Sequence, residues 1–330
     1  MWAEILIVTI VILVVWFFWL IISFRGWKRR LLLILKKNSN IADTSVGPIE
    51  YVLVGEGPVI VAIHGALGGY DQALFAIREF VEQGFSILAF SRPGYLRTPL
   101  SAGDTFEKQA DVIAALLDVL EIEKAAIIGS SAGGPAALHF ASKYPERTLA
   151  LCLICAVSQQ YMAEDTRGIA ILKRVLGSKT SLDFSAWLFD LLTRYRSSYS
   201  LKQMFKENAI LEPKQVGDCV QYVMSNPSQV EWYKEFVRTA CPLSPRKIGH
   251  DNDFLQLEQV SIPEISDIAA PTLIIHGTVD RVVPFSHAEF ASTIPNSTLC
   301  GLEDIGHIVW LGSHVDQMKR DILEFLGKNC

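Results

Sequence analysis

Ala125-Ala126-Ile127-Ile128-Gly129-Ser130-Ser131-Ala132-Gly133 is the stretch of sequence that decides the fold. Its first four residues are apolar and predict a buried strand, and the motif Gly-x-Ser-x-Gly follows directly. The two glycines permit a turn that is too tight for side chains. We therefore expect the hydroxyl of Ser131 to project from a sharp turn between this strand and the next helix.

Two later predicted strands are followed by residues that could activate a serine. Asp280 comes after the predicted strand Thr272–Ile275, and His307 comes after the predicted strand Ser297–Leu302. A serine hydroxyl is a poor nucleophile at neutral pH, so it needs a base within hydrogen-bond reach and a third group that orients the base. The carboxyl ends of parallel strands meet at one edge of a sheet. We therefore predict Ser131 as nucleophile, His307 as base and Asp280 as the orienting acid.

An oxyanion formed at such a serine also needs hydrogen-bond donors. The segment His64-Gly65-Ala66-Leu67-Gly68-Gly69 follows the predicted strand Val59–Ile63. We predict that the backbone N–H groups of Ala66 and Ala132 are these donors, each worth about 3–4 kcal/mol in the transition state. Backbone donors leave no side-chain signature, so both positions are inferred from their neighbouring motifs.

As a set, these motifs resemble the α/β-hydrolase superfamily. The resemblance covers about residues 48–157 and 265–330, and it includes the turn Ser91-Arg92-Pro93-Gly94-Tyr95. It implies a mostly parallel sheet wrapped by helices, a Ser…Asp…His triad and an acyl-enzyme intermediate. Haloalkane dehalogenases and epoxide hydrolases of this superfamily carry aspartate at the turn, so the serine argues against their chemistry. No cofactor is implied, and no cluster of residues has convincing metal-ligand spacing.

Other acids and histidines have plainer interpretations. Asp253 is a backup for the orienting acid, although its segment is expected to close the inserted helices onto the core. Asp304 is too near His307 in sequence to orient it. We expect His64 to hold the oxyanion loop and His276 to support the end of its strand.

Strands alternate with helices along most of the chain, which favours an α/β fold. The alternation stops at about Ser158 and resumes at about Thr272. We predict a transmembrane anchor with a basic juxtamembrane segment over 1–40, the first part of the hydrolase core over 45–157, a helical cap over 158–262, and the second part of the core over 263–330. The cap is rich in aromatic residues and methionine, and some of these should line an apolar pocket above the serine.

The N-terminal segment predicts the anchor. Residues 5–24 contain only Thr9 and Ser23 as polar residues, and a helix of this length spans roughly 30 Å, the thickness of the hydrocarbon core. A signal peptide would instead start with basic residues and end in a small-residue cleavage site. The basic residues follow the span, so the positive-inside rule predicts a single-pass membrane protein with its body in the cytoplasm. The run Leu31–Leu35 could lie along the membrane surface or begin the folded domain.

Charge and cysteine content limit the possible partners. The chain has 330 residues and a net charge of −5, and residues 1–40 hold six basic residues and one acid. The remainder is therefore acidic, which argues against nucleic acid as a partner.

Cys152 and Cys155 form C-x-x-C inside the predicted strand Leu149–Ala156, where residues three apart point to opposite faces. We expect both to be core residues in a reducing compartment.

The leading functional hypothesis is a membrane-tethered serine hydrolase that acts on carboxylic esters, with apolar or lipid-like acyl groups. The same triad could instead cleave an amide, as in proline iminopeptidase-like enzymes, or a carbon–carbon bond, as in meta-cleavage hydrolases. An aminopeptidase would need acidic groups in the cap for the substrate's amine, and the available ones are Glu164, Asp165, Glu207, Glu212 and Glu231. A non-catalytic ligand-binding member of the fold is a further alternative, although such members usually lose a triad residue.

Overall fold

The computed structural model describes residues 1–161 and 178–330. In these residues, eight strands form one sheet in the order β1-β2-β4-β3-β5-β6-β7-β8. The pairs β1–β2 and β2–β4 are antiparallel, and every other neighbouring pair is parallel. The strands are β1 (Asn40–Thr44), β2 (Gly47–Val54), β3 (Val59–Ile63), β4 (Ser86–Phe90), β5 (Ala125–Ser130), β6 (Thr148–Ile154), β7 (Thr272–Gly277) and β8 (Ser297–Leu302).

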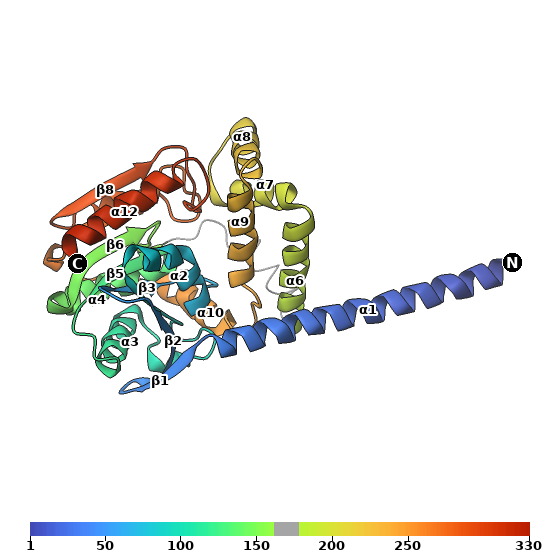
Figure 1. Cartoon of the computed structure of the whole chain (residues 1–330), viewed down its shortest axis with the longest axis horizontal. Coiled ribbons are helices and arrows are strands. Elements are labelled where there is room, and N and C mark those ends of the chain that lie inside the picture. Colours follow the sequence, from blue (N-terminus) through green and yellow to red (C-terminus); the bar gives the residue numbers. More distant parts are fainter. Residues whose placement is uncertain (162–177) are drawn as a thin grey trace.

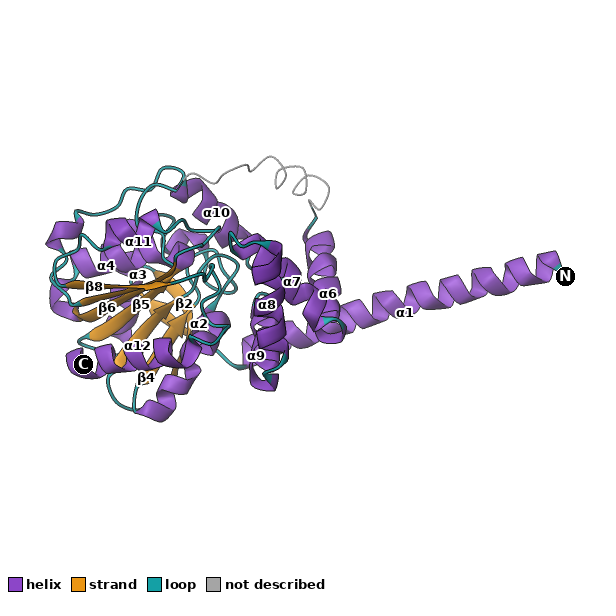
Figure 2. Ribbon diagram, turned by 90° about the horizontal axis from the view of Figure 1, so that it is seen from above, coloured by secondary structure: helices purple, strands orange, loops and turns teal. Residues whose placement is uncertain are grey.

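Helices cover both faces of the sheet (Figure 1 and Figure 2). The apolar side chains of α3, α4 and α11 pack on one face, and those of α2 and α12 pack on the other. The central strands are therefore buried on both faces, which explains why their sequences are apolar without alternation. These helices are α2 (Tyr70–Ile77), α3 (Phe106–Val119), α4 (Gly134–Lys143), α11 (Ser286–Ala291) and α12 (Val315–Asn329).

Helix α3 shows how the local sequence sets these elements. The hydroxyl of Thr105 accepts a hydrogen bond from the N–H of Lys108 at 3.2 Å, so it caps the first turn. Ile113, Leu116 and Leu117 form the buried stripe that packs on the sheet.

Five described helices lie between β6 and β7, in the segment predicted as the cap. Figure 1 shows α6 to α9 standing beside the sheet, whereas α10 returns toward it. Met162, Glu164 and Asp165 of the predicted cap lie outside the described residues. The helices are α6 (Lys179–Tyr195), α7 (Ser197–Asn208), α8 (Pro213–Met224), α9 (Pro227–Thr239) and α10 (Lys247–Leu257).

The N-terminal helix α1 (Trp2–Lys37) is longer than the predicted span, and its two parts differ in burial. Its apolar part is long and apolar enough to cross a membrane, with a mean hydropathy of 3.2 over its most apolar window, and this window is not buried. The C-terminal part instead packs on the body, because Phe24, Trp27 and Leu31 are buried against α6. The run Leu31–Leu35 therefore belongs to this helix. The sheet begins at Asn40, ahead of the predicted start at 45, because the sequence analysis did not recognise β1.

Candidate active site

Ser131 stands at the sharp turn between β5 and α4. Its backbone φ is +50°, a left-handed conformation that non-glycine residues rarely adopt. The neighbouring glycines permit the close approach that the turn requires. A Cβ on Gly129 would lie 2.6 Å from the Cβ of Ala137, and a Cβ on Gly65 would lie 2.9 Å from the Cβ of Ser131. The strained turn therefore holds the serine against the His64–Gly69 loop.

The structure brings together the three side chains that the sequence predicts as a triad. Nε2 of His307 lies 3.0 Å from Oγ of Ser131, and Nδ1 of His307 lies 2.7 Å from Oδ2 of Asp280. Ser131 follows β5, Asp280 follows β7 and His307 follows β8, so all three stand beyond the carboxyl ends of parallel strands. Both distances lie within hydrogen-bond range, and the imidazole bridges the hydroxyl and the carboxylate.

Asp280 is held as a carboxylate. Its Oδ1 accepts hydrogen bonds from the N–H groups of Val282 and Val283 at 2.8 and 2.9 Å. Burial alone would raise the pKa of Asp280, but the charge of His307 and hydrogen bonds from His276, His307 and Val283 outweigh burial and hold this pKa well below its usual range. The carboxylate is therefore ionised at neutral pH and can orient the imidazole.

Cys155 departs from its prediction as a strand residue. The strand β6 ends at Ile154, and Cys155 has a left-handed φ of +44°, so the opposite-face rule does not apply to it. Cys152 and Cys155 are instead buried in the same apolar cluster.

The turn at Cys155 places its thiol with His276 and Asp280, and the three ligand atoms lie within 4.8 Å of one another. Burial, followed by the charge of Asp280, raises the pKa of the Cys155 thiol well above its ordinary value. The Asp280 oxygens already accept the hydrogen bonds described above, so the triad accounts for the position of this carboxylate.

The loop His64–Gly69 after β3 is held by hydrogen bonds to its backbone carbonyl groups. Nε2 of His64 accepts the N–H of Arg92 at 3.0 Å, so the proton lies on Nδ1, which donates to the Gly65 carbonyl at 2.7 Å. Burial and then the charge of Arg92 lower the pKa of His64 well below its ordinary value, so this ring stays neutral. His64 thus holds the loop, as the sequence suggests. In a trans peptide the C=O and N–H point in opposite directions, so the N–H of Ala66 points away from the His64 ring.

Arginines tie this loop to the inserted helices. Arg92 donates to the His64 carbonyl at 2.9 Å, and its guanidinium binds both carboxylate oxygens of Asp253 at 2.9 and 2.5 Å. Arg246 donates to the Gly68 carbonyl at 2.7 Å and pairs with Asp71 at 2.8 Å. Asp253, the backup acid, is therefore engaged by Arg92 instead of orienting His307.

The sequence around Arg246 carries no signal for its contacts, because its partners lie about 175 residues away in the chain. Both arginine side chains are fully buried, so the charges of Asp253 and Asp71 are needed beside them.

A cavity of about 870 Å³ adjoins Ser131 and His307. Its walls come from the core, including Ala66, and from α6, α7 and α9. Among the described residues that line it, none is a lysine or an arginine, and Glu207 is the acid. A smaller cavity of about 300 Å³ is also lined by His307 and includes Asp304.

The other acids that the sequence offered for an amine serve local roles. Glu212 belongs to the capping box of α8, and Glu231 pairs with Lys234 on the exposed surface. Ala132 is buried directly after the serine.

The α/β hydrolase fold family matches residues 58–312, which include the sheet from β3 to β8 and all three members of the candidate triad. The chain belongs to the α/β-hydrolase fold family. Its sheet order and the serine at the turn agree with this membership, and the chain is accordingly a hydrolase.

Several proteins resemble this hydrolase over most of its length. An uncharacterized hydrolase of Bacillus subtilis is 30% identical over 85% of this chain and 95% of its own length. A 2-hydroxy-6-oxononadienedioate/2-hydroxy-6-oxononatrienedioate hydrolase of Comamonas testosteroni is 29% identical over 83% of this chain and 89% of its own. An α/β hydrolase fold protein from Nakamurella multipartita has a TM-score of 0.79 and 29% identity, over 87% of this chain and 98% of its own.

Proposed function

We propose that this protein is a membrane-anchored serine hydrolase that cleaves carboxylic esters with apolar acyl groups. The observation that carries the proposal is the continuous hydrogen-bonded chain from Ser131 through His307 to Asp280. A serine with a base and an oriented, ionised acid is equipped for nucleophilic attack on a carbonyl carbon.

The reaction follows from this geometry in two stages. Oγ of Ser131 attacks the ester carbonyl while Nε2 of His307 accepts the hydroxyl proton, and Asp280 stabilises the imidazolium through Nδ1–H. The tetrahedral intermediate then expels the alcohol, which takes the proton from His307, and an acyl-enzyme remains. Water, deprotonated by His307, attacks the acyl-enzyme and releases the carboxylic acid together with the regenerated serine.

The N–H groups of Ala66 and Ala132 are the proposed donors to the oxyanion. Two features support this assignment: Gly65 lies against Ser131, and its carbonyl is turned to His64 and Arg92. The N–H of Ala66 consequently points to the opposite side of the loop, and Ala66 lines the same cavity as Ser131. Such preorganised donors usually supply a large part of the rate acceleration.

The lining of the large cavity favours an apolar ester. Its walls are mainly aliphatic and aromatic, with side chains such as Phe189, Phe236 and Trp310. A hydrolase of a dioate, like the Comamonas relative, acts on a substrate with two carboxylates, and these would need cationic partners. The described lining offers no lysine or arginine for them. The names of the relatives nevertheless make carbon–carbon bond hydrolysis the second candidate function.

Amide hydrolysis is the weaker alternative. Of the acids that could hold a substrate amine, Glu207 lines the cavity, and its side chain is exposed to solvent. A single exposed acid offers little specificity for an ammonium group.

The membrane and cytoplasmic parts of the proposal rest on α1. A helix with an unburied apolar window of this length fits a bilayer, and basic residues cluster directly after it. By the positive-inside rule, the hydrolase body then lies in the cytoplasm.

Labelling with a fluorophosphonate probe tests the proposed serine. We expect the detergent-solubilised full chain and its Ser130→Ala variant to label, and Ser131→Ala to remain unlabelled with an unchanged circular dichroism spectrum. Labelling of Ser131→Ala would refute the assignment.

A substrate series then tests the reaction class. We expect p-nitrophenyl esters to be turned over faster as the acyl chain lengthens, whereas the dioate of the Comamonas relative and proline amides are not. Turnover of the dioate in preference to every ester would instead establish the carbon–carbon hydrolase.

A further inference from the structure

Helix α6 buries two carboxylates and exposes large apolar side chains, which is the reverse of the usual surface helix. Its buried side includes Asp183 and Asp190, which are 0% and 1% exposed, whereas Phe184 and Leu188 are 36% and 47% exposed. Tyr195 lies on the same stripe at the end of the helix and is 79% exposed. A helix that buries carboxylates and exposes large apolar side chains is poorly suited to a surface that faces water.

The buried aspartates of α6 have partners nearby and on α1. Asp190 pairs with Arg194 of the same helix at 2.6 Å, and Asp183 accepts the N–H of Ser244 at 2.7 Å. Lys28 pairs with Asp183 at 2.5 Å, and Nε1 of Trp27 donates to Asp190 at 2.8 Å. The ring of Phe24 lies 5.4 Å from that of Phe184. The anchor helix and α6 are therefore joined by both charge pairing and aromatic packing.

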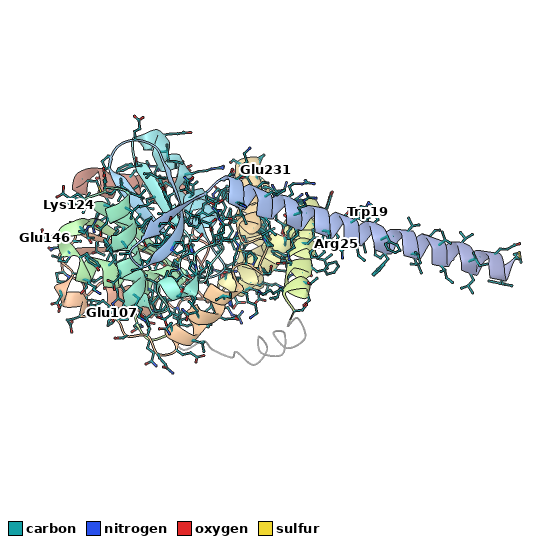
Figure 3. The ribbon with its side chains drawn as sticks, turned by 90° about the horizontal axis from the view of Figure 1, so that it is seen from below. Trp19, Arg25, Glu107, Lys124, Glu146 and Glu231 are labelled. Carbon is teal, nitrogen blue, oxygen red and sulfur yellow. The ribbon has the colours of Figure 1, made fainter. Side chains whose placement is uncertain are left out.

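This contact fixes the level of α6 relative to the anchor. Leu20 and Phe24 of α1 both pack on the α6 cluster, and they lie within the last residues of the apolar run that ends at Phe24. Four residues of helix rise about 6 Å, so the contact begins about that far inside the end of the predicted span. Figure 3 shows Arg25 beside the body and Trp19 on the protruding part of α1.

The direction of α6 relative to α1 indicates how α6 would lie against a bilayer. Figure 1 and Figure 2 both show α6 at the end of the body from which α1 protrudes, and it crosses α1 instead of running along it. If α1 crosses a bilayer, α6 lies roughly in the plane of the membrane surface. Phe184, Leu188 and Tyr195 form the stripe on this helix, which is the arrangement of an interfacial amphipathic helix.

We propose that α6 rests on the lipid surface through Phe184, Leu188 and Tyr195, and that acyl chains enter the large cavity from the bilayer beside Phe189. Phe189 is 39% exposed and also lines the cavity, so it stands at the rim, and Ser185 and Ala186 of the same helix line the wall. The second part rests on the proposed ester hydrolysis, because it names the source of the substrate for that site. The occupant of the stripe is lipid, since the stripe adjoins a helix that itself fits a bilayer.

Depth measurement tests the surface without relying on activity. The full chain carries Cys219→Ser, Cys300→Ser and Cys330→Ser, because these three cysteines are at least partly exposed. A nitroxide is attached to Leu188→Cys or, as the matched control, to Leu255→Cys. Leu255 is 67% exposed on α10, which both views place farther from the protruding end of α1. The protein is reconstituted in vesicles of phosphatidylcholine and phosphatidylglycerol, since Arg25, Arg29 and Arg30 are exposed near the contact.

We expect the nitroxide at position 188 to be more accessible to oxygen than to a water-soluble nickel complex, and the one at position 255 to show the reverse. Equal access of the nickel complex at both positions would overturn the proposal. Exclusion of both reagents at position 188 would also overturn it, because it would indicate contact with protein, such as a second copy of this chain.

Kinetics test the entry route. In the same vesicles, Leu188→Glu should lower the hydrolysis of a bilayer-embedded monoacylglycerol about tenfold relative to Leu255→Glu, while both variants keep the wild-type rate on a water-soluble acetate ester. Equal rates of the two variants on the monoacylglycerol would refute entry from the bilayer. A wild-type chain that shows the expected nitroxide depths but hydrolyses neither ester would refute the proposed function and leave the lipid contact standing.

Discussion

Replacing Asp253 with asparagine removes the negative charge beside buried Arg92 and so measures what that charge contributes to stability. The two side chains form a bidentate pair, and Oδ2 of Asp253 also accepts the hydroxyl of Tyr95 at 2.5 Å. Arg92 is 0% exposed, so water cannot replace the lost carboxylate. Burial alone would lower the pKa of Arg92, but the charge of Asp253 outweighs it, and this pKa lies above its ordinary value.

Breaking a buried ion pair from one side costs about 3–5 kcal/mol. Asparagine keeps the volume and one acceptor oxygen, so no cavity forms, but its amide group places donors opposite Arg92 and Tyr95. We therefore expect a loss near the lower bound, about 3 kcal/mol, which raises the unfolding equilibrium constant roughly a hundredfold.

The assay is urea denaturation of the detergent-solubilised chain, followed by circular dichroism. Asp104→Asn serves as the control, because Asp104 and its partner Lys108 are both largely exposed and their pair should contribute nothing measurable. Equal midpoints for Asp253→Asn and Asp104→Asn would refute the reasoning.

A paired replacement, Arg92→Met with Asp253→Leu, separates stability from catalysis. We expect it to recover only part of the stability. Apolar side chains can replace a buried ion pair at little cost, but the hydroxyl of Tyr95 and the His64 carbonyl lose their partners. Ester turnover should stay low, since Arg92 no longer holds the His64 and Gly65 carbonyls. Full recovery of both properties would show that Arg92 does not position the His64–Gly69 loop for catalysis.

Three further predictions follow from the site and from α1. Gly65→Ala should lower kcat at least about tenfold with an unchanged circular dichroism spectrum, because the added Cβ would fall 2.9 Å from the Cβ of Ser131, and wild-type kcat would contradict the expected crowding. The pKa of Asp280 is held low in the folded protein, so its carboxylate contributes stability above about pH 4 that is lost as the pH falls further. Urea midpoints should therefore show that wild type loses more stability than Asp280→Asn between about pH 5 and pH 3. Parallel losses would refute this prediction. Trp27→Phe removes one of the donors to buried Asp190, which keeps Arg194 as a partner, and should cost about 1 kcal/mol by urea denaturation. Trp19→Phe, on the protruding part of α1, should cost nothing measurable.

The buried strands and the positions of the candidate triad could be predicted because each depends on a short stretch of sequence. Apolar runs mark the buried strands, and the glycines around Ser131 mark a turn that few other residues can form. The strand ends then bring Asp280 and His307 to the same edge of the sheet. The catalytic roles of these residues, and the oxyanion donors, stay predictions.

What could not be predicted depends on contacts between distant segments. Nothing near Arg246 in the sequence indicates that it binds the Gly68 carbonyl, and nothing near Asp183 indicates Lys28 as its partner. The strand β1 was missed because its sequence, Asn-Ile-Ala-Asp-Thr, is short and mostly polar and forms the antiparallel edge of the sheet. The turn at Cys155 was missed because the apolar run continues past the end of β6.

The contact between α1 and α6 also decides how a soluble form of this hydrolase can be made. Deleting the chain up to the first strand would remove Trp27 and Lys28. Buried Asp190 would keep Arg194, but buried Asp183 would lose its charged partner and keep the N–H of Ser244. The cap helix would then be destabilised along the wall of the cavity. A truncation that begins near Leu20 would remove most of the apolar run and keep the α1 residues that pack against α6.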